Sequence, residues 1–501
     1  MDQQGNNPGM RFHAAGVLRG LGSVIQSSLS EGRFGRMFRN LPSLEPADGK
    51  LEALAKTMFE PEDTGNDDEE SEFDNPNIAA GITYLGQFID HDLTFDPASR
   101  LQRQNDPDAL HNFRTPRFDL DSVYGRGPDD EPFLYEPDGI KFRIGENAAG
   151  QDDLPRTAPD GTPRRALIGD PRNDENVIVS QLHLAFLKYH NRVVEDLQAK
   201  GLPEGRLFEE ARRIVRWHYQ WLVINSFLRT TVGFVPVDDI LQMDHIKVGT
   251  QSGTRDIAIR KVDLKFFHWD NRPFIPVEFS VAAYRFGHSL VRPEYELNDT
   301  APPDIPIFAP NPGPLGDLRG FRELPEEFQI EWHRFFKFPG TPEELQRARL
   351  IDTKLAIGLK KLPKSVVDKP PVSLAERNLK RGKALGLPSG QAVARRMGLP
   401  DDLVLGGDSL GLPDDLKDTF GERTPLWYYI LREAGELQAG QCLGPVGGRI
   451  VAEVFLGLLQ GDPFSYLRVQ PNWRPEPNEF GADGDGDFRM RHLLGHAGVT
   501  I

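Results

Sequence analysis

The chain has 501 residues, of which 38% are apolar and 9% aromatic, so it can bury a large core. Lys and Arg together number 59 and Asp and Glu 75, which gives a net charge of -16. This charge repels phosphate backbones and anionic membrane surfaces, so nucleic acid is excluded as an expected partner. Residues 1–20 lack a basic segment followed by an apolar one, and no stretch approaches the ~18 apolar residues of a membrane span.

The single cysteine, Cys442, excludes any disulfide within the chain. Packing, and any metal or cofactor that the protein binds, must therefore stabilise the fold. One cysteine and no export signal predict a cytoplasmic protein, and export by a non-standard route is the alternative.

Loops and helices alternate along the chain. Glycine and proline are abundant (49 and 41) and gather with acidic residues at 60–74, 106–163 and 298–314, which predicts long loops. Residues 175–200 carry a buried helical stripe at Ile178, Leu182, Ala185, Tyr189, Val193 and Leu197. Asp170 and Pro171 before this stripe predict an N-cap and a first-turn proline.

Similar helical patterns occupy residues 206–229, 281–290, 376–397, 425–437 and 446–460. Strand-like alternation appears only in short pieces such as 255–265. We therefore predict a mainly α fold with few short strands and long loops.

Residues 81–96 predict a short helix with chemically active side chains. Gln87 and His91 lie four residues apart on one face, beside Asp90. Asp92 is turned ~100° away, so one helical turn can present a histidine to one site and a carboxylate to another. A solvated helix end is the alternative interpretation.

An acidic loop follows this helix. Thr115, Arg117, Asp119 and Asp121 alternate with other residues, so in extended backbone their side chains point the same way. Carboxylates, a hydroxyl and backbone carbonyls suit Ca²⁺, and Asp92 can add a further oxygen. The alternative is an ordinary solvated loop.

Two further pairs share helical faces. Arg172 and Glu175 stand three residues apart at a helix start, where an ion pair at the helix end is the alternative. Asn378 and Arg381 have the same spacing and could orient a buried histidine and meet an anion, although a surface helix explains the charges equally well.

His288 follows Gly287 in an otherwise apolar helical segment. A satisfied core histidine is the more common explanation for such a residue. The glycine, however, would leave room for a flat cofactor beside a metal-ligating imidazole.

Taken together and in this order, the segments between residues 81 and 467 resemble the animal-type haem peroxidases of the peroxidase-cyclooxygenase superfamily, especially their bacterial members. The resemblance implies an N-terminal arm, residues 1–75, packed on a haem peroxidase catalytic domain, residues 76–501. On the distal side of the haem, it implies His91 as the acid/base, with Gln87 beside it, and Arg172 as the distal arginine. It implies His288 as the iron ligand, hydrogen-bonded by Asn378, Asp90 and Glu175 as ester links to haem b, and Arg285 and Arg381 as propionate partners. The calcium ligands that it implies are Asp92, Thr115, Arg117 (through its carbonyl), Asp119 and Asp121.

Three positions depart from the mammalian pattern. Asn176 stands where the most oxidising mammalian member has a methionine bonded to the haem, so we expect no third covalent link. Asp121 replaces a serine and Arg117 a phenylalanine, and the calcium site should survive both changes because one adds a carboxylate and the other uses its carbonyl.

The resemblance implies a peroxidase that reduces hydrogen peroxide and oxidises small anionic donors or phenols through a high-valent iron-oxo intermediate. Iodide, bromide and thiocyanate are the expected anions. We expect a monomer, and a role in the response to oxidative stress; the physiological donor stays open.

Three alternatives have discriminating features. A fatty-acid dioxygenase of the same superfamily needs a radical tyrosine three residues before the proximal histidine, where Arg285 stands; Tyr284 is one residue too early. A metal-dependent phosphohydrolase around His91 and Asp92 would need more ligands at short spacing. A non-enzymatic calcium-binding protein would be colourless when purified.

Overall fold

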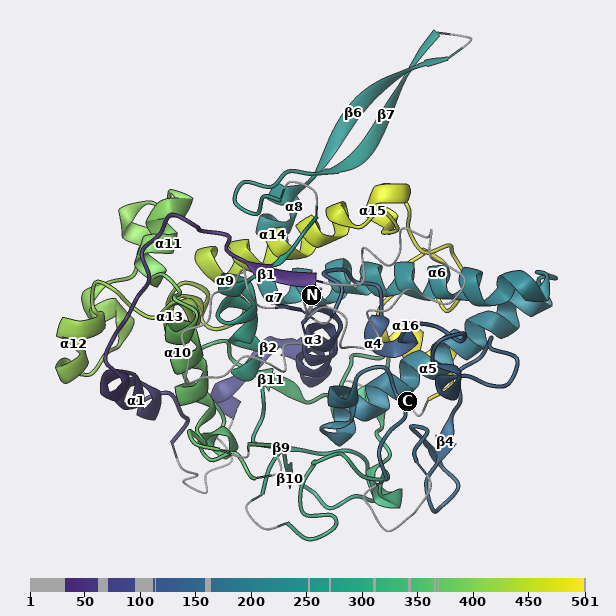
Figure 1. Ribbon diagram of the computed structural model, residues 1–501, viewed down its shortest axis with the longest axis horizontal. Helices are drawn as coiled ribbons and strands as arrows, with labels where there is room; N and C mark the ends of the chain where they lie inside the picture. The colour runs from purple at the N-terminus through teal and green to yellow at the C-terminus, as the bar shows by residue number, and fades with distance from the viewer. Residues whose placement is uncertain are drawn as a thin grey trace, which may run out of the picture.

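The protein is described by a computed structural model that covers residues 32–61, 71–94, 111–112, 114–157, 164–250, 253–269, 272–309, 312–340, 344–364, 366–367 and 369–499. Helices dominate it (Figure 1). The α-helices are α1 (Asp48–Lys56), α3 (Ala80–Leu93), α4 (Asp121–Tyr124), α5 (Val177–Ala199), α6 (Glu204–Leu222), α7 (Arg229–Val232), α8 (Phe234–Ile240), α9 (Val277–Ser280), α10 (Leu374–Ala384), α11 (Gly390–Met397), α12 (Asp414–Phe420), α13 (Leu426–Gln438), α14 (Pro445–Gly461), α15 (Tyr466–Val469) and α16 (Met490–Ala497).

Short 3₁₀ turns connect these helices: η3 (Ser71–Phe73), η5 (Pro132–Leu134), η6 (Pro171–Asp174), η8 (Ala283–His288), η9 (Glu326–Phe328), η10 (Trp332–Arg334), η11 (Ile357–Lys360), η12 (Asp401–Leu403) and η13 (Gly407–Leu410). A π-helical turn, η7 (Val223–Leu228), joins α6 to α7, so the segment predicted at 206–229 is one nearly continuous helical rod. None of the described helices combines the length and apolar character that a bilayer crossing requires.

Helices α3, α5, α6 and α14 form the centre of the core. Most of α3 and nearly all of α14 are buried around the whole helix circumference, as expected for central helices. Phe88 of α3 stacks on Phe186 of α5 at 4.6 Å, and Tyr219 of α6 packs edge-on against both. Aromatic packing of this kind holds α3 rigidly against α5 and α6.

The helix predicted at 175–200 is α5, but its predicted cap is wrong. Asp170 caps the 3₁₀ turn η6, where its side chain accepts from the backbone N–H of Arg172. Asn176 caps α5 instead, and its side-chain oxygen accepts from Ile178 N and Val179 N. Pro171 occupies the first position of η6 rather than of α5, because the short turn η6 comes before α5 begins at Val177.

Two predicted helices differ in the structure. Residues 376–397 form two helices, because Gly386 adopts a left-handed φ of 60° and Ser389 caps a new helix at α11. The segment 281–290 is the 3₁₀ turn η8, since Ala282 (φ -125°) breaks the backbone between α9 and η8. The predictions at 425–437 and 446–460 are confirmed by α13 and α14.

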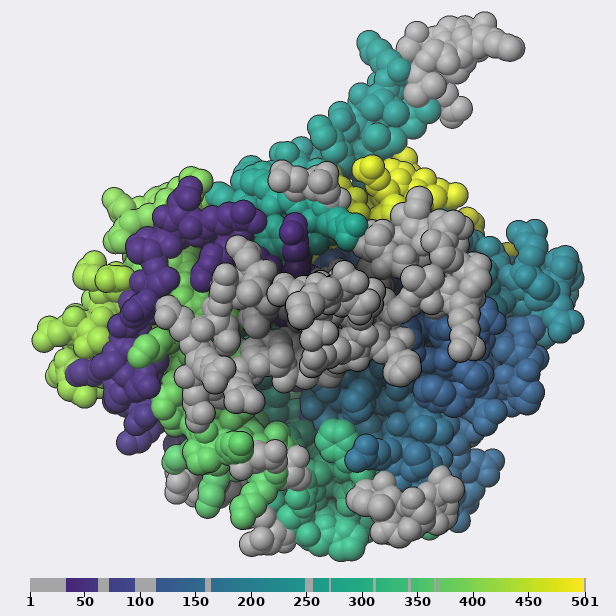
Figure 2. Space-filling model, in the orientation of Figure 1, coloured from purple at the N-terminus to yellow at the C-terminus, as the bar shows by residue number. Residues whose placement is uncertain are grey.

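The strands are few and short, except for one hairpin. β6 (Leu241–Thr250) and β7 (Gly253–Val262) pair antiparallel and project beyond the helical body (Figures 1 and 2). β7 contains most of the strand predicted at 255–265. The other strands are β1 (Gly32–Gly35), β2 (Asp74–Ala79), β3 (His111–Asn112), β4 (Gly145–Glu146), β5 (Asp152–Asp153), β8 (Ile275–Pro276), β9 (Glu294–Tyr295), β10 (Ile305–Pro306) and β11 (Arg347–Arg349). They form one three-stranded sheet, in the order β3-β1-β8, and the pairs β10-β9, β11-β2 and β4-β5.

The extended backbone predicted for residues 115–121 is wrong. This segment bends, Leu120 has a left-handed φ of 58°, and Asp121 begins α4. The bends satisfy local hydrogen bonds, such as the one from Asp121 N to the Asp119 carboxylate at 3.3 Å.

The described part of the N-terminal arm packs on the main body. β1 pairs with β8, and α1 lies beside α10 (Figure 1). The buried Glu278 carboxylate accepts from Met37 N and Phe38 N, both at 3.0 Å. Residues 1–31 and 62–70 lie outside the described residues, and the domain division at residue 75 stays a prediction.

Gly81 in α3 tests how tightly this core is packed. A methyl group there would lie 2.5 Å from the Phe335 carbonyl oxygen and from the Phe336 ring. Because a backbone oxygen cannot easily move away, we expect Gly81→Ala to lower the free energy of unfolding by about 1–3 kcal/mol in urea titrations. Gly49→Ala, whose methyl would meet nothing within 4 Å, is the control and should not destabilise. Equal stability of the two variants would contradict this packing.

Candidate functional site

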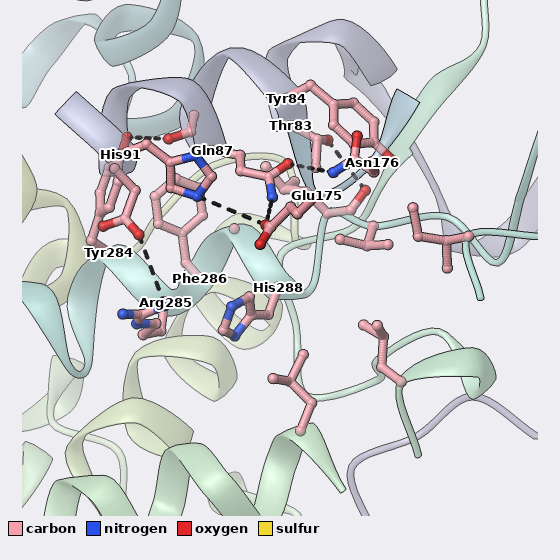
Figure 3. Close-up of a pocket in the computed structure, with 18 of the residues that line it drawn as sticks. Thr83, Tyr84, Gln87, His91, Glu175, Asn176, Tyr284, Arg285, Phe286 and His288 are labelled. Atoms are coloured by element: carbon pink, nitrogen blue, oxygen red, sulfur yellow. Dashed lines mark hydrogen bonds and ion pairs between the residues drawn. The ribbon is translucent and has the colours of Figure 1, made fainter. Parts of the chain in front are cut away.

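A cavity lies between α3, η6 and η8 and has an empty volume of about 1050 Å³, including its mouth. His91, Gln87 and Glu175 enter it from one side and His288 from the opposite side (Figure 3). The polar lining residues among our candidates are Gln87, Asp90, His91, Glu175, Arg285 and His288. Tertiary folding thus brings six of the predicted residues, from three separate segments, to one cavity.

His288 belongs to η8, and its ring is held from behind by α10. Nδ1 of His288 lies 2.8 Å from the side-chain amide of Asn378. This contact leaves Nε2 to face the cavity. Burial, followed by the charge of Arg285, lowers the pKa of His288 to about 3. The imidazole is therefore neutral at physiological pH, which is the form that ligates a metal.

His91 is buried and faces the same cavity from α3. Its Nδ1 lies 2.8 Å from Oδ1 of Asn173, and its Nε2 lies 3.8 Å from Oε1 of Glu175. Burial and then the charge of Arg172 lower the pKa of His91 to about 4. The ring is thus a neutral acceptor poised at the cavity.

The carboxyl groups of Glu175 and Asp90 have opposite electrostatic surroundings. Burial raises the pKa of Glu175 to about 7, and Gln87 Nε2 donates to its carboxyl oxygen. Burial would also raise the pKa of Asp90, but Arg285, 3.9 Å away, and Arg172 outweigh it and lower that pKa. Asn176 connects to this group because its Nδ2 donates to Gln87 Oε1 at 3.1 Å.

Arg172 lies beside the cavity, where it contacts His91, and neither Arg172 nor Arg381 is among the residues that line the cavity in the described part of the chain. The Arg172 guanidinium donates to both carboxylate oxygens of Asp170 and to the carbonyls of His91 and Thr94. Its positive charge nevertheless contributes to lowering the pKa of His91, and it opposes the rise that burial causes in the pKa of Glu175. Arg381 is half-buried on α10, one turn beyond Asn378.

The cavity suits a large flat cofactor with a central metal. Its remaining walls are mostly apolar, with side chains such as Phe286, Leu290 and Leu374, and a methyl group added at Gly287 would meet open space. Ligand cavities with mostly apolar walls and a few oriented polar groups have this character. The neutral imidazole of His288 supplies a nitrogen ligand, and the residues present therefore fit a haem.

A second site is built from carboxylates on α3 and the following loop. Ligand oxygens of Asp92, Asp119 and Asp121 all lie within 4.8 Å of one another. Burial, and then the neighbouring carboxylates, raise the pKa of Asp92, and burial raises that of Asp121 to about 7. Thr115 joins the group because its hydroxyl donates to Asp119 at 2.9 Å.

Hard oxygen ligands crowded at this distance are those that Ca²⁺ prefers. The Arg117 side chain pairs with Asp119 and Asp462 at 3.5 and 3.8 Å, and the role of its carbonyl stays a prediction. Among the described residues, the acidic, histidine and cysteine side chains grouped closely enough to hold a metal are these three aspartates.

Two residues of the site were not predicted from the sequence. Asn173 contacts His91, and Arg114 connects Asp170 to Asp121. Asn173 lies within the run that contains Arg172 and Glu175, but spacing alone could not show that it turns toward α3. Arg114 precedes the predicted calcium loop by one residue and carries no periodic signal.

The chain is similar to known proteins over most of its length. The sequence model for "Animal haem peroxidase" matches residues 99–401. The chain is similar to a peroxidase-like protein of Margaritifera margaritifera, with 27% identity over 485 residues that cover 80% of this chain and 56% of that protein. It is also similar to a peroxidasin of Drosophila melanogaster, with 24% identity over 339 residues that cover 64% of this chain and 20% of that protein. The chain thus spans about half the length of the first of these relatives and a fifth of the second.

Solved structures share the fold. Peroxidase A from Dictyostelium discoideum superimposes with a TM-score of 0.56 at 17% identity, covering 88% of this chain and 90% of that one. A fatty acid alpha-dioxygenase from Oryza sativa gives a TM-score of 0.53 at 16% identity, covering 90% and 75%. The predicted mainly α fold class is confirmed.

The carboxylate cluster generates a metal-binding prediction. Since a bound divalent cation would relieve the mutual repulsion of Asp92, Asp119 and Asp121, added Ca²⁺ should raise the thermal unfolding temperature and a chelator should lower it. At a hundredfold excess over Kd the stabilisation should be about 2.7 kcal/mol.

Asp92→Asn should abolish this calcium response, whereas Asp129→Asn, an exposed carboxylate outside the cluster, should keep it. Scanning calorimetry with and without Ca²⁺ measures both. An unchanged response in Asp92→Asn would place calcium elsewhere.

Proposed function

Because the chain belongs to the animal haem peroxidase family, we propose that it is a haem peroxidase, which reduces hydrogen peroxide and oxidises small donors such as iodide, bromide, thiocyanate or phenols. The observation that carries the proposal is the pair of neutral histidines, His91 and His288, that face one cavity from opposite sides (Figure 3). One histidine can hold a metal while the other moves a proton.

The residues around His288 would hold the haem. Haem, when bound, supplies the redox chemistry, and the protein positions the haem and sets the electrostatic environment around it. His288 would bind the iron through Nε2, so its Nδ1 would carry the proton and the Asn378 amide would turn its oxygen toward that proton. Asp90 and Glu175 line the cavity and would form the two ester links. Arg285 and Arg381 would meet the propionates.

His91 would move one proton within the peroxide. Its Nε2 would accept the proton from one peroxide oxygen and would return it to the other oxygen, which leaves as the O–O bond breaks. Negative charge develops on the leaving oxygen, and the Arg172 cation beside the cavity would stabilise it by up to ~3 kcal/mol. Burial supports this role for His91, because it keeps the imidazole neutral and able to accept.

A fatty-acid dioxygenase is the alternative within the same fold. Tyr284 does line the cavity, but its hydroxyl donates to the Gly86 carbonyl at 3.0 Å, and Arg285 stands three residues before His288. We therefore favour the peroxidase over the dioxygenase as the function of this chain. Oxygen uptake with a long-chain fatty acid, in the absence of added donor, would instead favour the dioxygenase.

The first experiment is the absorption spectrum of the full chain produced with haem. We expect a Soret band that His288→Ala loses, because the iron loses its protein ligand. His218→Gln is the control, since His218 is a buried histidine that hydrogen-bonds to Ile214 O and does not line the cavity. A colourless wild-type protein would contradict the peroxidase proposal and would favour the alternative of a non-enzymatic calcium-binding protein.

Acidified-solvent extraction tests the covalent links. We expect haem to stay with the wild-type protein, to be released from Asp90→Asn and Glu175→Gln combined, and to remain attached through one link in each single variant. The amides keep the shape of the carboxyl groups but cannot form esters. Mass spectrometry of the extracted protein measures the attachment, and full release from the wild type would contradict both links.

His91→Gln tests the proton transfer. The second-order rate constant for hydrogen peroxide should fall by about 10²- to 10⁴-fold, because a general acid/base is removed, while the Soret absorbance stays. Stopped-flow mixing measures this rate, and His218→Gln again serves as the control. An unchanged rate would mean that another group moves the proton.

A further inference from the structure

A continuous chain of three buried polar side chains leads away from the cavity. His91 Nδ1 lies 2.8 Å from Asn173 Oδ1, and Asn173 Nδ2 lies 2.9 Å from His183 Nδ1. His91 is 4% exposed, and Asn173 and His183 are fully buried. The three residues come from α3, η6 and α5, so the chain exists only after these elements pack.

The amide in the middle fixes where the protons lie. An amide oxygen can only accept a hydrogen bond and an amide nitrogen can only donate one. Asn173 Nδ2 therefore donates to a bare Nδ1 of His183, and Asn173 Oδ1 accepts from a protonated Nδ1 of His91. A neutral His91 with its proton on Nδ1 has its lone pair on Nε2, the nitrogen that approaches Glu175 at the cavity.

The middle residue and the far end of this chain of side chains make further contacts that hold them in place. The Asn173 backbone N–H donates to the Asp170 carbonyl at 3.0 Å, which closes the turn η6. The His183 ring packs edge-on against Phe88 at 6.1 Å within the central core. Because all three groups are buried, no water can easily replace a missing partner.

His183 is an unexpected residue in so apolar a place. Its Nε2 is buried and has no hydrogen-bonding partner among the described residues. A buried polar atom without a partner is destabilising, and an apolar side chain here would avoid that penalty. The hydrogen bond that its Nδ1 accepts from Asn173 is therefore what the imidazole contributes at this position.

We propose that Asn173 and His183 are positioning residues that hold His91 in the tautomer with a bare Nε2, ready to take the peroxide proton. This inference rests on the proposed function and deepens it. The proton of the peroxide moves to Nε2 of His91 and then to the leaving oxygen, while the proton on Nδ1 stays bonded to Asn173. Without the amide, His91 could place its proton on Nε2 and lose its ability to accept.

The test compares variants of the haem-loaded full chain. Asn173→Leu and His183→Phe keep the volume but remove the hydrogen bonds, and we expect the rate constant for hydrogen peroxide to fall by about 10- to 100-fold. His183→Gln retains a carbonyl acceptor for Asn173 and should restore most of the rate. Asn75→Leu removes a buried amide that bonds Gly440 O elsewhere, and should keep the wild-type rate.

Proton NMR of the cyanide complex supplies a readout that does not depend on turnover. We expect one solvent-protected Nδ1–H signal from His91, identified by its loss in His91→Gln and absent or rapidly exchanging in Asn173→Leu. A wild-type spectrum without a protected Nδ1–H signal from His91, or wild-type rates in Asn173→Leu and His183→Phe, would overturn the inference. A wild-type chain that binds no haem would instead overturn the proposed function itself.

Discussion

The buried carboxylate of Asp170 is the interaction on which both candidate sites depend. It accepts from the backbone and guanidinium of Arg172 on the cavity side, and from Arg114, which also reaches Asp121 in the carboxylate cluster. Burial alone would raise the pKa of Asp170, but the bonds and charge of Arg172, and then the charge of Arg114, hold it well below its usual range. The carboxylate stays charged, and two cations are fixed in place around it. Removing it would leave these cations uncompensated.

Helix α3 serves both sites because of its geometry. His91 and Asp92 are neighbours in sequence, yet the ~100° step between successive residues sends the imidazole to the cavity and the carboxylate to the aspartate cluster. The helix can be used in this way because most of its other side chains are buried, against α5, α6 and the segment at Phe335. A metal in the cluster would thereby stabilise the same helix that presents the proposed proton acceptor.

Burial also decides the chemistry of the two histidines. Both rings would be partly protonated in water near neutral pH, whereas in the cavity their pKa values fall to about 4 and about 3. Desolvation is the larger cause in each case, and an arginine adds to it. The proposed roles of metal ligand and proton acceptor both require a neutral imidazole, and the two histidines meet this requirement at one cavity.

The sequence by itself predicted the mainly α fold, the principal helices and the residues that gather at the cavity. Its periodicity predicted α5, α13 and α14, and the motifs around His91, Glu175 and His288 carried the resemblance to animal haem peroxidases. These features are local or repeat at short spacing, so they are visible in one dimension. The calcium loop was predicted in composition but not in conformation, because the left-handed Leu120 that turns Asp121 toward Asp92 leaves no periodic trace.

Only the tertiary structure decided which side chains meet across long distances. Asn173 and His183 are ordinary residues in sequence and become partners of His91 because α3, η6 and α5 pack together. The guanidinium of Arg172 turns toward Asp170, because a buried carboxylate attracts the cation more strongly than an open cavity does. Hydrogen bonds and charges satisfy one another in three dimensions, and neither spacing nor propensity encodes that outcome.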